Sequence, residues 1–315
     1  FRGCLLAALA GDCLGAQFEF LSSAVQLPHC LAGVRRQHAR AAPLAAGVHR
    51  RHGADKGRLR VARRLPAVAL NRRRWPRSLT TPTLRPPTVA TARPLAASLK
   101  TFENANFADP FGPAAALFEG RAMATGGAMR AAPLGLIGAA AAAAPNAEEV
   151  HLATRVTHSN ALALAGARLM AAAVRLALRF DGVDVDRLYD SLAAEAAAAD
   201  TACGLHEGEA SSYTSSMRQV KEFLGKHPAS SAVDEEARAN PSIDEALSIE
   251  QRQQQQQRLL DCLTFAVSLG GDTDTIASMA GAIVGAALGA DALPASLMLA
   301  CEASDAVDSL ATRLH

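Results

Sequence analysis

Apolar residues in this chain gather in long segments of small side chains, and their spacing favours helices over the strict alternation of a surface strand. The segments are residues 1–20, 131–144, 148–180, 184–199 and 276–290. In the first of them, Leu5, Leu6 and Leu9 are expected to face a core before Gly11 and Gly15 loosen the helix. The segments at 131–144 and 276–290 are shorter than the roughly 20 residues that a bilayer requires. We therefore expect buried helices and no membrane partner.

Two further patterns interrupt the helical segments. Glycines at Gly281, Gly285 and Gly289 recur every four residues, which would let another helix approach closely. Residues 225–257 are polar and end in the run Gln253 to Gln257, which predicts a surface loop or a disordered insert.

Composition supports a single all-α domain over residues 1–315. Half of the residues are hydrophobic, but aromatic residues make up only 4%, and strands draw on aromatic and β-branched side chains. The six cysteines show no Cys-x-x-Cys pair, so neither a zinc site nor a disulfide framework is indicated. A reducing intracellular compartment fits best: the cytoplasm or nucleus, with the mitochondrion as an alternative because a targeting segment could precede Phe1.

The last apolar helix begins beside a cluster of oxygen-bearing side chains, Asp272, Thr273, Asp274 and Thr275. Two carboxylates at a helix N-terminus repel each other and favour a hard divalent cation, so Asp272, Asp274 and Thr275 are candidate metal ligands. The alternative is that Asp272 serves only as an N-cap, for which Asp is favoured on local grounds. An EF-hand is excluded, because Ala277 stands where that loop needs its glycine.

The distribution of charge is uneven. Between Arg35 and Arg93 stand 15 arginines and one lysine against a single acid, Asp55, and the rest of the chain has a net charge of −13. Such a tract is typical of a nucleic-acid-binding arm. Its six prolines and its arginines follow neither a helical nor a strand period, however, and Trp75 is its only aromatic residue for stacking. We expect disorder over about residues 30–95 rather than nucleic-acid binding.

Four short motifs together resemble the ADP-ribosylglycohydrolase family. Gly-Gly-Asp-Thr-Asp-Thr-Ile at 270–276 is similar to the family's C-terminal metal motif, and Gly-Asp-x-x-Gly-x-x-x-Glu at 11–19 to its N-terminal motif. Thr-Gly-Gly-Ala-Met-Arg at 125–130 resembles the family's diphosphate-binding loop, with Thr125 in place of an Asn. Thr-His-Ser at 157–159 resembles a motif whose His lies near bound ADP-ribose. The 11–19 and 270–276 motifs are most like the branch that acts on serine-linked ADP-ribose and poly(ADP-ribose), with a role in the DNA damage response.

The resemblance implies a fold, a cofactor and site residues. The fold would be an orthogonal multi-helix bundle, and two Mg²⁺ ions would orient a water onto the anomeric carbon of ADP-ribose. Glu19 and Asp274 would be catalytic, and Glu19, Asp272, Asp274 and Thr275 would bind metal. Thr125, Gly126, Gly127 and His158 would bind substrate. Asp12 is a further candidate whose role stays open. In a continuous helix it lies about 10 Å from Glu19, too far for the two carboxylates to share an ion without other ligands between them.

One expected motif is missing. The family's second metal motif, Tyr-Thr-Asp-Asp-Thr-Ala, should follow the first by a few tens of residues, and the sequence has Val48-His49-Arg50-Arg51-His52-Gly53 there instead. Codons for the motif, read two bases early, give Val-His-Arg-Arg-His-Gly. We interpret about residues 30–95 as an out-of-frame translation, and expect weak or single-ion binding from the chain as it stands.

Function is expected to be hydrolysis of ADP-ribosyl bonds, with ADP-ribose, ADP-ribosylated protein, poly(ADP-ribose) or O-acetyl-ADP-ribose as partners and a monomeric state. Two alternatives stay open: a catalytically impaired relative that still binds ADP-ribose, and a nucleic-acid binder that uses the arginine-rich tract. The sequence does not identify the acceptor residue.

Overall fold

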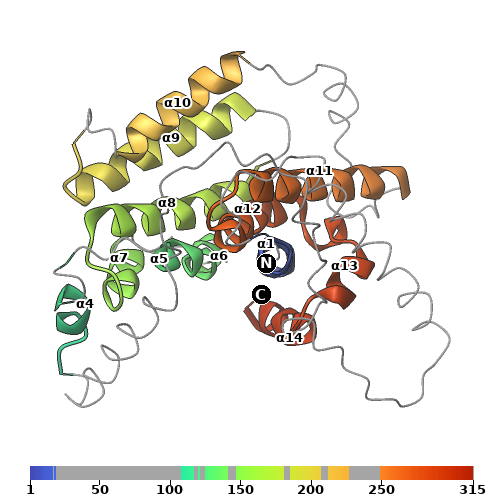
Figure 1. Ribbon diagram of the computed structural model, residues 1–315, viewed down its shortest axis with the longest axis horizontal. Helices are drawn as coiled ribbons and strands as arrows, with labels where there is room; N and C mark the ends of the chain where they lie inside the picture. Colours follow the sequence, from blue (N-terminus) through green and yellow to red (C-terminus); the bar gives the residue numbers. More distant parts are fainter. Residues whose placement is uncertain are drawn as a thin grey trace, which may run out of the picture.

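The computed structural model describes residues 1–16, 18, 108–116, 120, 125–140, 147–180, 185–206, 212–226 and 249–314. Within these ranges every regular element is a helix, which confirms the all-α prediction (Figure 1). The helices are α1 (Arg2–Gly15), α4 (Gly112–Ala116), α5 (Gly126–Met129), α6 (Ala132–Ala140), α7 (Ala147–Arg155), α8 (Ala161–Ala177), α9 (Val185–Ala202), α10 (Tyr213–Lys226), α11 (Ile249–Ser268), α12 (Thr273–Leu288), the 3₁₀ turn η5 (Ala290–Ala292), α13 (Ala295–Ala300) and α14 (Ser304–Leu314).

Helices α1 and α12 form an antiparallel pair at the centre of the molecule (Figure 1). Their backbones touch: a Cβ atom added to Gly281 would lie 2.2 Å from the Ala7 carbonyl oxygen, and one added to Gly285 would lie 2.2 Å from the Gly3 carbonyl oxygen. The predicted glycine ladder is therefore a packing face, and its partner is α1. Contrary to expectation, Gly11 does not loosen α1; the helix continues past it to Gly15, and Gly11 lies against the backbone of Ala277.

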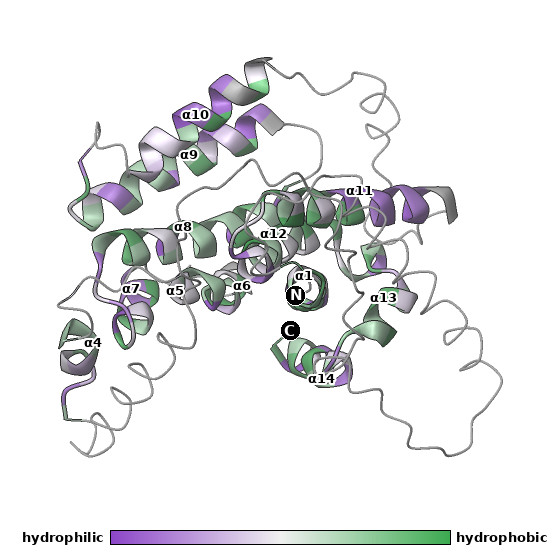
Figure 2. Ribbon diagram, viewed as in Figure 1, coloured by the Kyte–Doolittle hydropathy of each residue, from purple (hydrophilic) through white to green (hydrophobic). Residues whose placement is uncertain are grey.

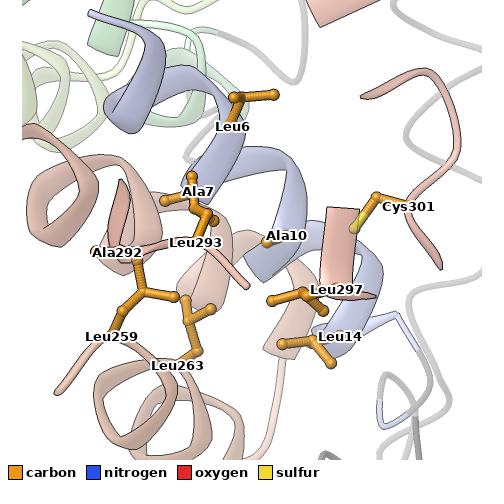
Figure 3. Close-up of a cluster of buried hydrophobic side chains, with 10 residues drawn as sticks. All are labelled: Leu6, Ala7, Ala10, Leu14, Leu259, Leu263, Ala292, Leu293, Leu297 and Cys301. Carbon is orange, nitrogen blue, oxygen red and sulfur yellow. The ribbon is translucent and has the colours of Figure 1, made fainter. Parts of the chain in front are cut away.

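One buried cluster of hydrophobic side chains packs against α1 (Figure 3). It joins α1 to α11, η5 and the segment around α13, so the two ends of the chain share a core. Its members are Leu6, Ala7, Ala10, Leu14, Leu259, Leu263, Ala292, Leu293, Leu297 and Cys301. Outside this cluster, the Arg2 guanidinium holds the Asp308 carboxylate of α14, with Nε 2.6 Å from Oδ1 and Nη2 2.9 Å from Oδ2.

A second cluster lies between α1, α6, α8 and α12, and it includes Leu136, Met170 and Val174. Helices α9 and α10 run side by side and form an outer layer beyond α8 (Figure 1). The Asp200 carboxylate near the end of α9 fixes the start of α10, because it accepts hydrogen bonds from the Tyr213 and Thr214 backbone N–H groups at 3.2 and 2.7 Å. The centre of the molecule is apolar, whereas α10 and the first half of α11 carry much of the polar surface (Figure 2).

Two sequence predictions about elements are wrong. The helix expected over 148–180 is two helices, because Asn160 adopts an extended backbone and its side chain accepts a hydrogen bond from Leu162 N–H at 2.9 Å, which starts α8. The run Gln253 to Gln257 is helical rather than a loop or disordered, since it lies in the exposed first half of α11. Glutamine is a good helix former, so this part of α11 can be helical although its side chains are exposed. The tract over 30–95 lies outside the described residues.

No helix in the described ranges is long and apolar enough to cross a bilayer. The apolar segments at 131–144 and 276–290 instead supply α6 and most of α12, as predicted.

Candidate active site

The acidic cluster lies where predicted, at the start of α12. Gly270 and Gly271 take φ values of 73° and 76°, which side-chain-bearing residues rarely adopt, and they turn the chain from α11 into α12. Asp272 occupies the N-cap position, but its side chain makes no capping hydrogen bond. The Asp274 carboxylate accepts a hydrogen bond from Thr275 N–H at 2.7 Å. Asp272 therefore has a carboxylate that local capping does not use.

The predicted diphosphate loop meets this acidic cluster directly. Thr125 Oγ1 donates a hydrogen bond to Asp272 Oδ2 at 3.0 Å, across 147 positions of the sequence. A second contact follows one turn further on, where the Thr275 hydroxyl lies 3.8 Å from Met129 Sδ. The short helix α5 and the start of α12 thus form one wall, with an exposed Thr125–Asp272 pair and a buried Thr275.

The end of α1 reaches the same place. The buried Thr273 hydroxyl donates to the Gly15 carbonyl at 2.8 Å. A Cβ atom on Gly15 would lie 2.4 Å from Asp274 Cα, so the N-terminal motif packs against the backbone of the C-terminal motif. Glu19 lies outside the described residues, and its role as catalyst and ligand stays a prediction.

His158, in the loop between α7 and α8, lies against the glycine pair Gly126 and Gly127. Cβ atoms added to Gly126 and Gly127 would lie 3.7 Å from His158 Cε1 and 3.4 Å from His158 Nδ1. His158 is buried, and its Nδ1 lies 2.8 Å from Thr157 Oγ1. The structure therefore brings Thr125, Gly126, Gly127 and His158 together with Asp272 and Asp274.

Asp12 is half-buried on α1, and burial raises the pKa of its carboxyl above the ordinary value. It lines a groove of about 770 Å³ between α1, α6, α12 and α14, together with Met129 and Ser278. Among the described residues that line this groove, Asp12 is the only predicted site residue. The groove borders the site through Met129, and its walls are mostly apolar, so we place the chemistry at the Thr125–Asp272 wall instead.

The donors that could hold a metal are all oxygens, as a hard cation prefers. Over the described residues, no group of three or more His, Cys, Asp or Glu side chains is arranged to hold a metal ion. Asp272, Asp274 and Thr275 supply two carboxylates and a hydroxyl at one helix start. That set fits one hard cation in kind, but not the shells of two ions.

Sequence reasoning gave no role to Arg130 or Thr157, although both stand inside the quoted motifs. Arg130 Nη2 donates to Thr157 Oγ1 and to the carbonyls of Ala153 and Thr154, at 3.2 and 3.4 Å for the two carbonyls. Partial burial lowers the pKa of the Arg130 guanidinium. The sequence signal that could have pointed to Thr157 was its hydroxyl, which stands next to the predicted site residue His158.

Comparisons with known proteins agree with this geometry. The family model described as ADP-ribosylglycohydrolase matches residues 1–315. The protein named ADP-ribosylhydrolase ARH3 in Danio rerio is 34% identical over 69% of this chain and 64% of its own length. Its Homo sapiens counterpart is 29% identical over 100% of this chain and 92% of its own length, and an Escherichia coli (strain K12) protein, Uncharacterized protein YegU, is 30% identical over 62% of this chain and 60% of its own.

The match runs through all four motifs, including those that the structure places side by side, and agrees with the all-helical architecture. The chain belongs to the ADP-ribosylglycohydrolase family of glycosidases, which act on ADP-ribosyl bonds.

Proposed function

We propose that this protein hydrolyses the O-glycosidic bond at C1″ of ADP-ribose with the help of Mg²⁺. Its substrates would be serine-linked ADP-ribosylated protein, poly(ADP-ribose) or O-acetyl-ADP-ribose. The observation that carries the proposal is the 3.0 Å hydrogen bond from Thr125 to Asp272. This hydrogen bond joins the loop expected to bind the diphosphate of ADP-ribose to Asp272 and Asp274, whose carboxylates are expected to act at the ribose.

Three residues would hold a metal ion here: Asp272 and Asp274 through their carboxylates, and Thr275 through its hydroxyl. Glu19 is the further predicted ligand. When bound, Mg²⁺ would lower the pKa of a water molecule and so supply a nucleophile near neutral pH.

The protein's own groups would supply proton transfer, charge stabilisation and positioning. The Asp274 carboxylate would accept the proton of the attacking water, and the negative charge of Asp272 and Asp274 would stabilise an oxocarbenium-like transition state. Thr125 restrains the Asp272 carboxylate by donating to Oδ2, so this oxygen keeps its direction. Gly126 has no side chain to obstruct approach to His158, which leaves room for the substrate.

A second candidate is supported by the sequence itself. The Thr-Asp-Asp ligands of the second family motif are absent from residues 1–315, and Arg50 and Arg51 stand within the segment that replaces them. A chain of this kind would bind ADP-ribose but turn it over slowly or not at all.

One experiment separates the two. ADP-ribose binding is measured by calorimetry, and release of ADP-ribose from a serine-ADP-ribosylated peptide is measured with Mg²⁺ and with EDTA. Both measurements use the chain as it stands and a version with the reading frame shifted across 30–95. Asp272→Ala and Asp274→Ala should each abolish Mg²⁺ binding, because each removes a carboxylate ligand. Asp305→Ala, an acid in the first turn of α14, is the matched control and should change nothing.

Turnover that requires Mg²⁺ in either version would support the enzyme. Binding without turnover in both versions would select the impaired relative. No binding and no turnover in either version would refute the proposal, and unchanged Mg²⁺ affinity in both aspartate variants would refute the ligand assignment.

A further inference from the structure

A directed chain of hydrogen bonds leads from α5 to the site histidine. Arg130 Nη2 donates to the Thr157 hydroxyl oxygen, and that oxygen lies 2.8 Å from His158 Nδ1. Thr157 and His158 are both buried, with exposed fractions of 8% and 6%, so water does not readily substitute for either partner. The proposed reaction assigns no task to Arg130 or Thr157.

The chemistry of Arg130 fixes the direction of the first hydrogen bond in this chain. An arginine guanidinium only donates hydrogen bonds and has no acceptor. The Thr157 oxygen therefore accepts from Arg130, and its single hydroxyl proton is left for one other acceptor. Two acceptors lie in reach, His158 Nδ1 at 2.8 Å and the Thr154 carbonyl at 3.4 Å. The Thr154 carbonyl already accepts from the Thr157 and His158 backbone N–H groups at 3.1 and 3.0 Å, and 3.4 Å exceeds the ordinary length of a hydroxyl hydrogen bond. We therefore infer that the hydroxyl proton goes to Nδ1.

A histidine that accepts at Nδ1 carries its own proton on Nε2. That nitrogen lies on the side of Gly126, where an added Cβ would be 3.9 Å from Nε2 and 3.7 Å from Cε1. The Cε1–Nε2 edge of the imidazole thus lies along the glycine pair that the proposed function assigns to substrate.

We propose that Arg130 and Thr157 are positioning residues that hold His158 as the Nε2–H tautomer, so that this N–H can donate to a phosphate oxygen of ADP-ribose. The substrate half of this inference rests on the proposed function. The tautomer half concerns the free protein and stands without it.

Arg130 has a second effect on the same loop. Its guanidinium also donates to the Ala153 and Thr154 carbonyls at the end of α7, and the Thr154 carbonyl accepts from the Thr157 and His158 backbone N–H groups as well. Substitution of Arg130 would therefore disturb the loop itself, and Thr157 is the better residue to change.

Four proteins test the inference: the unmodified chain, Thr157→Val, Thr157→Ser and Thr154→Val. Valine has the shape of threonine without its hydroxyl, and serine keeps the hydroxyl. Thr154→Val is the matched control, since the buried Thr154 hydroxyl donates to the Val150 carbonyl at 2.7 Å and makes no hydrogen bond to His158. The measurements are the tautomer of His158 by ¹⁵N NMR of the imidazole, assigned with His158→Gln, and the Kd for ADP-ribose by calorimetry.

We expect the Nε2–H tautomer in the unmodified protein, in Thr157→Ser and in Thr154→Val, and its loss in Thr157→Val. ADP-ribose binding should weaken about five- to tenfold in Thr157→Val alone, the effect of one lost hydrogen bond. A proton on Nδ1 in the unmodified protein, or an unchanged tautomer in Thr157→Val, would overturn the inference. If none of the four proteins binds ADP-ribose while the tautomers behave as expected, the proposed function fails together with the substrate half, and the positioning of His158 by Thr157 stands.

Discussion

The contact between α1 and α12 predicts the effect of a single methyl group. In Gly281→Ala, the new Cβ would lie 2.2 Å from the Ala7 carbonyl oxygen and 2.8 Å from the Ala7 carbonyl carbon. Ordinary contact needs roughly 3.5 Å, so the helices must separate by about 1 Å. The obstructing atoms belong to the helix backbone, which cannot move aside as a flexible side chain can.

Two opposing terms set the size of the effect. Alanine is a better helix former than glycine by about 1 kcal/mol. Overpacking in a tight core costs about 1–3 kcal/mol, and more where backbone must shift. Because α1 carries residues of both buried clusters around it, a displaced α1 also loosens those contacts. We expect a net loss of about 1–3 kcal/mol in the free energy of unfolding, or a fall in Tm of roughly 2 to 10 °C.

The assay is thermal and urea unfolding followed by far-ultraviolet circular dichroism, with Gly225→Ala as the matched control. Gly225 lies in the last turn of α10, and no atom lies within 4 Å of its added Cβ. Gly225→Ala should therefore stabilise the protein by up to about 1 kcal/mol. If Gly281→Ala gains stability as Gly225→Ala does, α1 and α12 do not pack backbone to backbone, and the placement of Gly15 beside Asp274 fails with them.

Two other substitutions test groups near the site. Burial raises the folded-state pKa of Asp12, so the folded protein holds this proton more tightly and the free energy of unfolding falls as pH rises from the ordinary carboxyl range through the raised pKa. Asp12→Asn should then be more stable than the unmodified protein in urea at about pH 7 and close to it at about pH 3.5, below the ordinary carboxyl pKa; an equal difference at both pH values would contradict this. Thr273→Val removes a buried hydroxyl that donates to Gly15 O at 2.8 Å and should cost about 1 kcal/mol. Thr312→Val, whose exposed hydroxyl donates within α14, should cost almost nothing, and equal losses would argue against a special role for the Thr273 bond.

The helices could be predicted from the sequence wherever an apolar period ran for several turns. The period placed α9, α12 and the end of α8 within a few residues, but it did not show the break before α8. That break depends on one capping side chain, Asn160. The run of glutamines misled for a different reason: low complexity indicates a loop, but glutamine itself favours a helix, and α11 needs only its second half to be buried.

The close approach of a helix to Gly281 and Gly285 was predictable, whereas the identity of that helix was not. Small residues on α12 show only that some partner fits there. The complementary small residues, Gly3 and Ala7, stand more than 250 positions earlier, and no local period connects them. The same limit applies to the site, since Asp272 and Thr125 were separate candidates until the fold placed their side chains 3.0 Å apart.

Thr125 departs from the family pattern, and the structure shows what its side chain does. The resemblance puts an Asn at this position, and this chain has Thr125 there. In the structure, Thr125 uses its hydroxyl as a donor to Asp272 Oδ2. An asparagine amide is also a donor, so the exchange keeps the kind of hydrogen bond that restrains the acidic residue. What it gives up is the amide's second donor and its carbonyl acceptor. Any effect on substrate therefore comes through those lost groups, while the direction of the Asp272 carboxylate is preserved.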